Sequence, residues 1–116
     1  MYNEKFMDIA LEEAKLALDE NEVPVGAVIV KDGVVIAKAH NTREKTKNAL
    51  HHAEVIAIDN ACKELSGWRL WQCEMYVTME PCPMCAGDIV NDRITHVYFG
   101  SYGKKYDTCL SVNDRL

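Results

Sequence analysis

Two turn residues, Asp32 and Gly33, separate two runs of β-branched and other apolar residues at 27–31 and 34–38. An Asp-Gly pair between such runs is the strongest short-range signal for a β-hairpin, because both residues tolerate the positive φ angles of a tight turn. Neither run alternates regularly between apolar and polar residues. The pattern therefore predicts two antiparallel strands that are covered on both faces, as in a layered α/β protein.

The rest of the chain alternates between helical and strand-like segments. Apolar residues recur at helical spacing in residues 3–20, behind the candidate N-cap Asn3, and again in residues 52–65. A shorter helix is predicted for residues 83–91, and strands are predicted for residues 74–78 and 94–99. Residues 42–50 are predicted to form a loop, and residues 101–116 show no recognisable element. The order α-β-β-α-β-α-β predicts a three-layer α/β/α sandwich.

The length and composition are those of a small globular protein. We expect all 116 residues, 1–116, to form one domain, since 48% are hydrophobic and 27% are charged. The first residues lack the basic and apolar regions of a signal peptide, and no apolar run approaches the ~18 residues that span a bilayer. We therefore expect a cytoplasmic protein that is not associated with a membrane. Disulfides are rare in that compartment, so the five cysteines need another explanation.

Cys82 and Cys85 form a Cys-x-x-Cys motif at the start of the third predicted helix. The motif alone fits either a redox protein of the thioredoxin type or a metal site. A thioredoxin-like fold needs a later cis-proline that faces the motif, and no proline follows Pro83. His52, 30 residues before Cys82, supplies a third ligand. Three protein ligands with an open fourth position are typical of a catalytic zinc site.

Glu54 follows His52 by two positions. Positions i and i+2 lie ~200° apart around a helix, so both side chains can reach one point only beyond the helix N-terminus. The same holds for the two cysteines at the start of the next helix. We therefore expect one zinc ion near two positive helix ends, which favour thiolates. Glu54 would lie close enough to move a proton from water to a leaving group.

The pattern His52-Ala53-Glu54, followed by Pro81-Cys82-Pro83-Met84-Cys85, resembles the signature of the zinc-dependent cytidine deaminase superfamily. Within it, the chain is most similar to the bacterial tRNA-specific adenosine deaminases, over residues 3–101. The segments that carry this similarity are 23–30, 39–41, 52–58, 68–70, 75–87 and 93–94. The resemblance implies the α/β/α sandwich of the cytidine deaminase type, with a central mixed sheet and helices on both faces.

The same resemblance implies a hydrolytic enzyme that converts adenosine to inosine at the wobble position of a tRNA anticodon loop. The implied roles are zinc binding, one Zn²⁺ per chain, by His52, Cys82 and Cys85; catalysis by Glu54; and substrate binding by Asn41, Val25 and Met79. Family members are typically homodimers. Basic residues within 43–47 and at 104–105 are expected to hold RNA phosphates.

Two features, Asp88 and the tail, depart from the family pattern. Asp88 stands where a small apolar residue is usual, about one helical turn after Cys85. The tail, residues 101–116, lacks the family's glycine-containing loop and is short for its fifth strand and last helix. A short tail would leave the edge of the fourth strand without cover. The net charge of −5 argues against a general polyanion binder.

Two other functions are compatible with the motif. A deaminase of a free nucleobase or nucleoside, of the guanine or cytosine type, would have the same core residues, and the short tail favours it. A zinc-stabilised binding module would use Glu54 only as an acid at a helix start. The other cysteines are predicted to be buried or inert, and the other histidines to be ordinary surface or core residues: Cys62, Cys73, Cys109, His40, His51 and His96.

Overall fold

The computed structural model describes residues 2–67, 69–79, 83–101 and 104–107. Its elements follow the order α1 (Glu4–Asp19), β1 (Gly26–Lys31), β2 (Val34–His40), α2 (Arg43–Thr46), α3 (Ala53–Leu65), β3 (Cys73–Val77), α4 (Pro83–Asn91), β4 (His96–Ser101) and β5 (Lys104–Asp107). The strands form one sheet in the order β2-β1-β3-β4-β5. β3 and β4 are parallel, and the other neighbouring pairs are antiparallel. The predicted mixed sheet is therefore confirmed.

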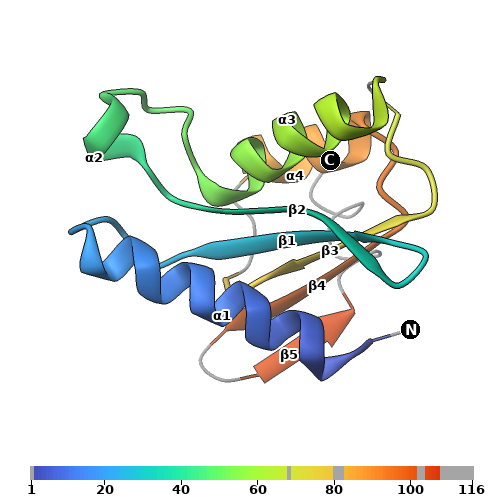
Figure 1. Ribbon diagram of the computed structural model, residues 1–116, viewed down its shortest axis with the longest axis horizontal. Coiled ribbons are helices and arrows are strands. Elements are labelled where there is room, and N and C mark those ends of the chain that lie inside the picture. The colour runs from blue at the N-terminus through green and yellow to red at the C-terminus, as the bar shows by residue number, and fades with distance from the viewer. Residues whose placement is uncertain (1, 68, 80–82, 102–103, 108–116) are drawn as a thin grey trace.

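Helices cover both faces of this sheet (Figure 1). α1 packs on one face, where Phe6, Met7 and Ala10 meet the strand residues Val28 and Tyr76. α3 and α4 pack on the opposite face over a second apolar cluster. That cluster includes Ala57, Ala61, Ile29, Met75, Val77 and Ile89. The three-layer α/β/α arrangement predicted from the order of elements is confirmed.

The β1–β2 hairpin turns at Asp32 and Gly33, whose φ angles are 52° and 77°. Both values are positive, as the Asp-Gly signal predicted. β1 is buried along nearly its whole length, as expected, but β2 is not. β2 is the edge strand of the sheet, so it has a neighbour on one side only, and Val34 at its start is 60% exposed. Burial on both faces was therefore a correct prediction for β1 and a wrong one for β2.

Two elements lie where no regular structure was predicted. α2 is a single helical turn inside the segment predicted to be a loop. β5 pairs antiparallel with β4, with Gly100 opposite Lys105. This short strand lies along the edge of β4 that the sequence suggested would be uncovered. The predicted shortening or loss of the last helix concerns residues 108–116, which lie outside the described residues.

α1 approaches β1 very closely at one position. A Cβ atom added to Gly26 would lie 2.0 Å from the carbonyl oxygen of Ala10 and 2.6 Å from the amide nitrogen of Ala14. The side-chain carboxamide of Asn3 caps α1 by accepting from the amide of Lys5 at 3.0 Å. The same residue's own amide donates to the hydroxyl of Tyr76 at 2.9 Å. α1 is thus fixed to the sheet along its length.

Within the part of the chain that the structure describes, no helix is both long enough and apolar enough to cross a bilayer.

Candidate functional site

The candidate site lies at the first turn of α3. His52 is the N-cap residue of this helix, with an extended backbone of φ −75° and ψ 152°. Its carbonyl accepts the first backbone hydrogen bond, from the amide of Ile56, at 3.1 Å. Glu54 lies in the first helical turn and is 4% exposed. A carboxyl group is therefore buried at the N-terminus of a helix, two residues beyond the histidine's cap position.

α4 brings a cysteine to the same point. Cys85 is fully buried in the first turn of α4, and its Sγ lies 3.6 Å from Nδ1 of His52. One ligand atom from each of His52, Glu54 and Cys85 lies within 4.8 Å of the others. The structure therefore brings together three of the four residues that the sequence grouped, at two helix ends. The fourth, Cys82, lies outside the described residues.

The separation of the sulfur and nitrogen atoms fits a tetrahedral zinc ion. Zinc binds thiolate sulfur at about 2.3 Å and imidazole nitrogen at about 2.05 Å, so two such ligands at a tetrahedral angle lie about 3.6 Å apart. The observed distance between Cys85 Sγ and His52 Nδ1 is 3.6 Å. A borderline nitrogen donor beside a soft sulfur donor is also the chemistry that zinc prefers. The described residues of this site therefore fit a zinc ion.

The environment shifts the pKa values of the site residues in directions that suit these roles. Burial, followed by the charge of Arg43, lowers the pKa of His52, which favours the neutral ring that binds metals. Burial raises the pKa of Glu54, and hydrogen bonds from its own backbone amide and from Cys85 oppose this only in part. A buried carboxyl with a raised pKa is suited to accept and return protons near neutral pH.

Asn41 links the end of β2 to the start of α3. Its backbone amide donates to the carbonyl of Val25 at 3.2 Å, and its side-chain Oδ1 accepts from the amide of Ala53 at 2.7 Å. Asn41 is 5% exposed and lies next to the residue that follows His52. Because Oδ1 is committed to Ala53, the amide nitrogen Nδ2 is the group that Asn41 can present to a base.

The other two predicted substrate contacts lie near the same end of the sheet. Val25 is buried and its carbonyl holds Asn41, as described above. Gly26, the next residue, exchanges hydrogen bonds with Thr78: its amide donates to Oγ1 at 3.1 Å, and its carbonyl accepts from the Thr78 amide at 3.0 Å. Met79 follows Thr78 and is 49% exposed. One buried and one accessible apolar residue therefore adjoin the hydrogen-bonded pair Gly26 and Thr78.

Sequence reasoning missed the contacts that order the segment between Asn41 and His52. Nδ1 of His51 lies 2.7 Å from the hydroxyl of Thr46, and Nε2 lies 3.1 Å from Nδ2 of Asn48. The Asn48 carboxamide oxygen also accepts from the amide of Leu50 at 2.9 Å. The histidine directly before His52 is therefore held by its own loop. Such contacts have no spacing signature, because they depend on how the loop folds back on itself.

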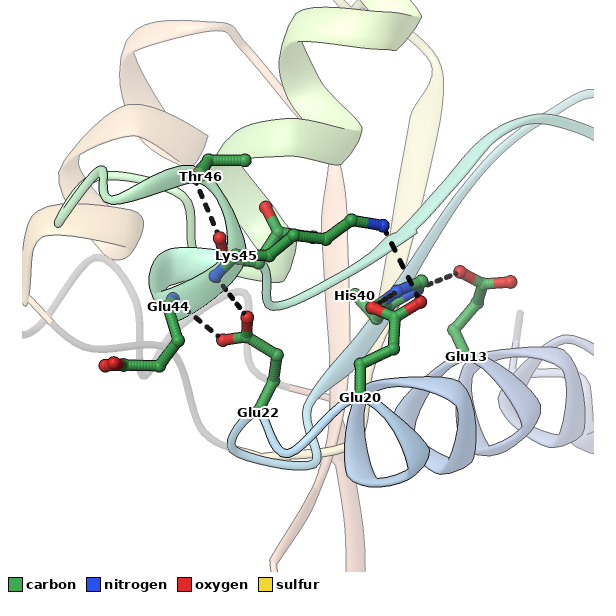
Figure 2. Close-up of polar contacts among 8 residues, drawn as sticks. Glu13, Glu20, Glu22, His40, Glu44, Lys45 and Thr46 are labelled. Carbon is green, nitrogen blue, oxygen red and sulfur yellow. Dashed lines mark hydrogen bonds and ion pairs between the residues drawn. The ribbon is translucent and has the colours of Figure 1, made fainter.

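The carboxylate of Glu22 anchors the start of the same segment (Figure 2). It accepts from the backbone amides of Glu44 at 3.1 Å and Lys45 at 2.8 Å. Burial by itself raises the pKa of Glu22, but these two hydrogen bonds, together with the charges of His40 and Arg43, lower it below its ordinary value. Glu13 is also buried, because it lies on the apolar face of α1. An acidic residue among the apolar residues of a helical face is a sequence signal that its carboxylate has a buried partner.

A groove of 710 Å³ lies beside the site, between the 42–51 segment and α3, and its lining includes His51, Val55 and Asp59. Asp88 of α4 and Asp92, which follows that helix, also line it. Burial, then the hydrogen bond and charge of Asp88, raises the pKa of Asp92 to about 7. Asp88, which departs from the family pattern, therefore acts on the carboxyl group of Asp92, one turn away.

Of the other cysteines, Cys73 is buried and Cys62 half-buried, both as free thiols.

Comparison with known proteins agrees with this geometry. Residues 1–101 match the family described as the cytidine and deoxycytidylate deaminase zinc-binding region. The tRNA-specific adenosine deaminase of Bacillus subtilis strain 168 is 50% identical over 103 residues, which is 89% of this chain and 64% of that protein. The chain thus spans just under two thirds of the length of this relative.

Two solved structures are similar in fold. One comes from studies of A-to-I editing by tRNA:A34 deaminases at the wobble position, with a TM-score of 0.80 and 44% identity over 82% of this chain and 73% of that one. The other is the guanine deaminase of Bacillus subtilis, with a TM-score of 0.83 and 39% identity over 87% of this chain and 65% of that one. With a family match over most of its length and a His-Glu-Cys cluster in place, the chain belongs to the cytidine and deoxycytidylate deaminase family.

Proposed function

We propose that this protein hydrolyses adenosine to inosine at the wobble position of a tRNA anticodon loop. The observation that carries the proposal is the buried carboxyl of Glu54 beside the His52–Cys85 pair, at the ends of two helices. The substrate is taken from the relative that is 50% identical and from the similar structure studied for wobble editing. An unpaired loop suits such a site, because its bases need the least energy to leave the stack.

The cofactor in this proposal is one zinc ion per chain, held by His52, Cys82 and Cys85. Zinc, when bound, supplies a Lewis acid that lowers the pKa of water to about 7. The protein's part is to hold the ligands at two helix N-termini and to keep His52 neutral. Its lowered pKa and its place beside the buried thiol of Cys85 support this role.

Glu54 moves the protons in the proposed reaction. Water adds at C6 of adenine, the bond from C6 to the exocyclic nitrogen breaks, and ammonia leaves. Glu54 takes one proton from the attacking water and delivers it to the ring nitrogen N1, where it stays, and then carries the second proton, from the hydroxyl formed at C6, to the departing amine. Its raised pKa supports both halves of this cycle, because the same group must hold and release a proton.

Three residues position the base in this proposal. Asn41 donates from its amide nitrogen to an acceptor on the base, because its oxygen is held by Ala53. Val25 and Met79 supply apolar contact with the face of the base. Val25 precedes Gly26 and Met79 follows Thr78, and hydrogen bonds between Gly26 and Thr78 hold these two segments side by side. This pairing supports a common pocket.

The RNA backbone would contact the segment before α3. Arg43, Lys45 and Lys47 are exposed there, on α2 and the residue that ends it. Because the net charge is −5, binding of RNA depends on this local group of cations and should weaken steeply with salt.

We also propose that the protein is a cytoplasmic homodimer. The groove of 710 Å³ beside the site is a suitable surface for a second copy.

The test is a deamination assay with an anticodon stem-loop RNA that carries adenosine at the wobble position, scored for inosine by mass spectrometry. We expect inosine from the wild type and a fall of about 10³-fold in kcat for Glu54→Gln, because general acid–base catalysis commonly contributes that much. Glu64→Gln, at an exposed position of the same helix, is the matched control and should retain full activity.

Free guanine, cytosine and their nucleosides form the second arm of the assay, with ammonia release as the readout. The similarity to guanine deaminase makes a free purine the alternative substrate. Release of ammonia from guanine without inosine in the RNA would replace the proposed substrate. Full activity of a zinc-loaded Glu54→Gln variant would refute the assigned mechanism.

A further inference from the structure

One histidine outside the site is held between two carboxylates (Figure 2). His40, the last residue of β2, places Nδ1 2.9 Å from a carboxylate oxygen of Glu13 and Nε2 3.0 Å from one of Glu20. Glu13 lies in α1 and Glu20 is the C-cap residue of that helix, so the ring ties the end of β2 to α1. The Glu13 side chain is 9% exposed and the His40 side chain 18%, so water competes little for the inner contact.

The number of protons on this ring follows from the geometry. A carboxylate can only accept hydrogen bonds, and a neutral imidazole has one N–H donor and one acceptor. Two carboxylates can therefore both be satisfied only by an imidazolium, which donates from both nitrogens. When the ring loses a proton, one contact becomes two facing acceptors, and one carboxylate must move or take up the proton itself.

The segment that follows His40 carries the site. Asn41 is the next residue, and its side chain caps α3 at Ala53, directly after the zinc ligand proposed at position 52. Glu20 also faces the ammonium group of Lys45 in α2, at 3.9 Å. Glu13 and Glu20 therefore hold one end of the segment, and Glu20 also reaches its middle.

We propose that His40, in its protonated form, is a positioning residue of the site: by holding β2 to α1, it sets Asn41 against the first turn of α3. Loss of the proton frees the end of β2 and loosens the hydrogen bond between Asn41 and Ala53. The inference rests on the proposed function for its catalytic consequence, but its structural part does not depend on the substrate.

The charged surroundings favour the protonated ring. Burial lowers the pKa of His40, but hydrogen bonds and charge from Glu13 and Glu20 outweigh it, so the pKa is raised. Several titratable and charged groups surround the ring. Glu13 and Glu20 contact it, Lys45 of α2 faces Glu20, and Glu22 interacts with it through charge. Three further groups line the groove that His40 also lines: Lys38, His51 and Asp59. The two nearest are acids, so deprotonation of His40 removes the positive charge that both carboxylates contact and leaves Glu20 with the Lys45 ammonium group at 3.9 Å.

The first experiment uses the zinc-loaded wild type and an NMR titration. The ¹⁵N shifts of both His40 ring nitrogens should be those of N–H donors at pH 6, and the ring should titrate above the ordinary value of 6.5. We expect the amide resonance of Ala53 to move with the same midpoint. Its protection from hydrogen exchange, corrected for base catalysis, should fall by about tenfold, as the loss of a charge-assisted hydrogen bond predicts.

The second experiment compares Glu20→Gln with Glu12→Gln. A glutamine at position 20 can donate its amide to a neutral ring, so this variant should satisfy His40 without the second proton and lower its pKa. Glu12 is exposed on the same helix, and its substitution removes the same charge without touching the ring. We expect the ratio of kcat/KM on the RNA hairpin, Glu20→Gln over Glu12→Gln, to rise about tenfold from pH 6.5 to pH 9.

The results separate the two claims. An Ala53 amide that stays unchanged while His40 titrates, or a His40 ring that is neutral at pH 6, would overturn the positioning role. A flat ratio between the two variants in an active enzyme would also overturn it. A chain that deaminates no RNA but whose Ala53 amide follows His40 would support the coupling and refute the proposed function.

Discussion

Gly26 shows how a single hydrogen atom decides the spacing of two layers. The backbone of α1 lies so close to β1 at this point that a Cβ would meet the Ala10 carbonyl at 2.0 Å. The atom that the Cβ would meet belongs to the backbone, so no side-chain rotation can relieve the contact. Glycine is needed here because the helix approaches closely, and the apolar pattern of the flanking residues gives no sign of this.

We expect Gly26→Ala to lower the free energy of unfolding by about 3 kcal/mol, since overpacking against backbone forces α1 away from the sheet. The matched change is Gly87→Ala in α4, where an added Cβ would meet no atom of the described residues within 4 Å. That change should raise stability by up to about 1 kcal/mol, because alanine is the better helix former. Urea unfolding of the two variants provides the measurement, and equal effects would contradict the assigned contact.

Asp88 and Asp92 make stability depend on pH. The fold raises the pKa of Asp92 from an ordinary value of 3.8 to about 7, so it favours the protonated carboxyl. The stability that this proton provides is fully present below pH 3.8 and is lost as the pH rises through about 7. Asp92→Asn keeps a donor for Asp88 and should remove this decline between pH 4 and pH 7. Thermal unfolding across that range, with the exposed Asp8→Asn as control, measures it.

At the scale of elements, α2 has a single turn and depends on its surroundings. A helix of four residues cannot form alone, because nucleation is unfavourable and few hydrogen bonds follow. The carboxylate of Glu22 supplies what the sequence of α2 lacks, by accepting from the amides of Glu44 and Lys45. The turn therefore depends on a buried acid that the fold places against it. The local sequence pattern does not include this acid, and for that reason it predicted a loop.

Glu22→Gln tests this anchor. The amide that replaces the carboxylate can offer only one oxygen, and its NH₂ group faces a backbone donor, so we expect α2 to open. Hydrogen exchange at the amides of Glu44 and Lys45 should become faster, while exchange within α3 stays unchanged. Unaltered protection at residue 45 would show that the carboxylate does not hold the turn.

At the scale of the whole molecule, the site joins elements that are far apart in the chain. His52 precedes α3 and Cys85 lies in α4, and both helices pack on one face of the sheet. A zinc ion bound between them would act as a cross-link and would bind the folded state alone. Ligands of that kind stabilise by about 2.7 kcal/mol at a hundredfold excess over Kd.

We therefore expect chelation to lower the melting temperature by roughly 10–20 °C, given about 4–8 °C for each kcal/mol in a domain of this size. Added zinc should restore it in the wild type but not in Cys85→Ser. Cys62→Ser is the control, since this half-buried thiol lies apart from the cluster. Calorimetry with and without chelator measures this shift in melting temperature. An identical melting temperature in both conditions would refute a structural contribution from zinc.

The sequence by itself determined the order of the main elements, the Asp-Gly hairpin and the grouping of His52, Glu54 and Cys85. Each of these depends on local information: apolar periodicity, turn chemistry, or a motif at the start of a helix. The likeness to the deaminase family could also be read from those short segments.

Only the tertiary structure decided the rest. β5, α2, the cap of Asn41 on Ala53 and the contacts of His40 with two acids each depend on a partner elsewhere in the fold. Glu13 and His40 are 27 residues apart, and no periodicity relates them. A polar group is stabilised by the particular donor or acceptor that packing brings within about 3 Å. Which partner that is depends on how the helices and the sheet pack against one another.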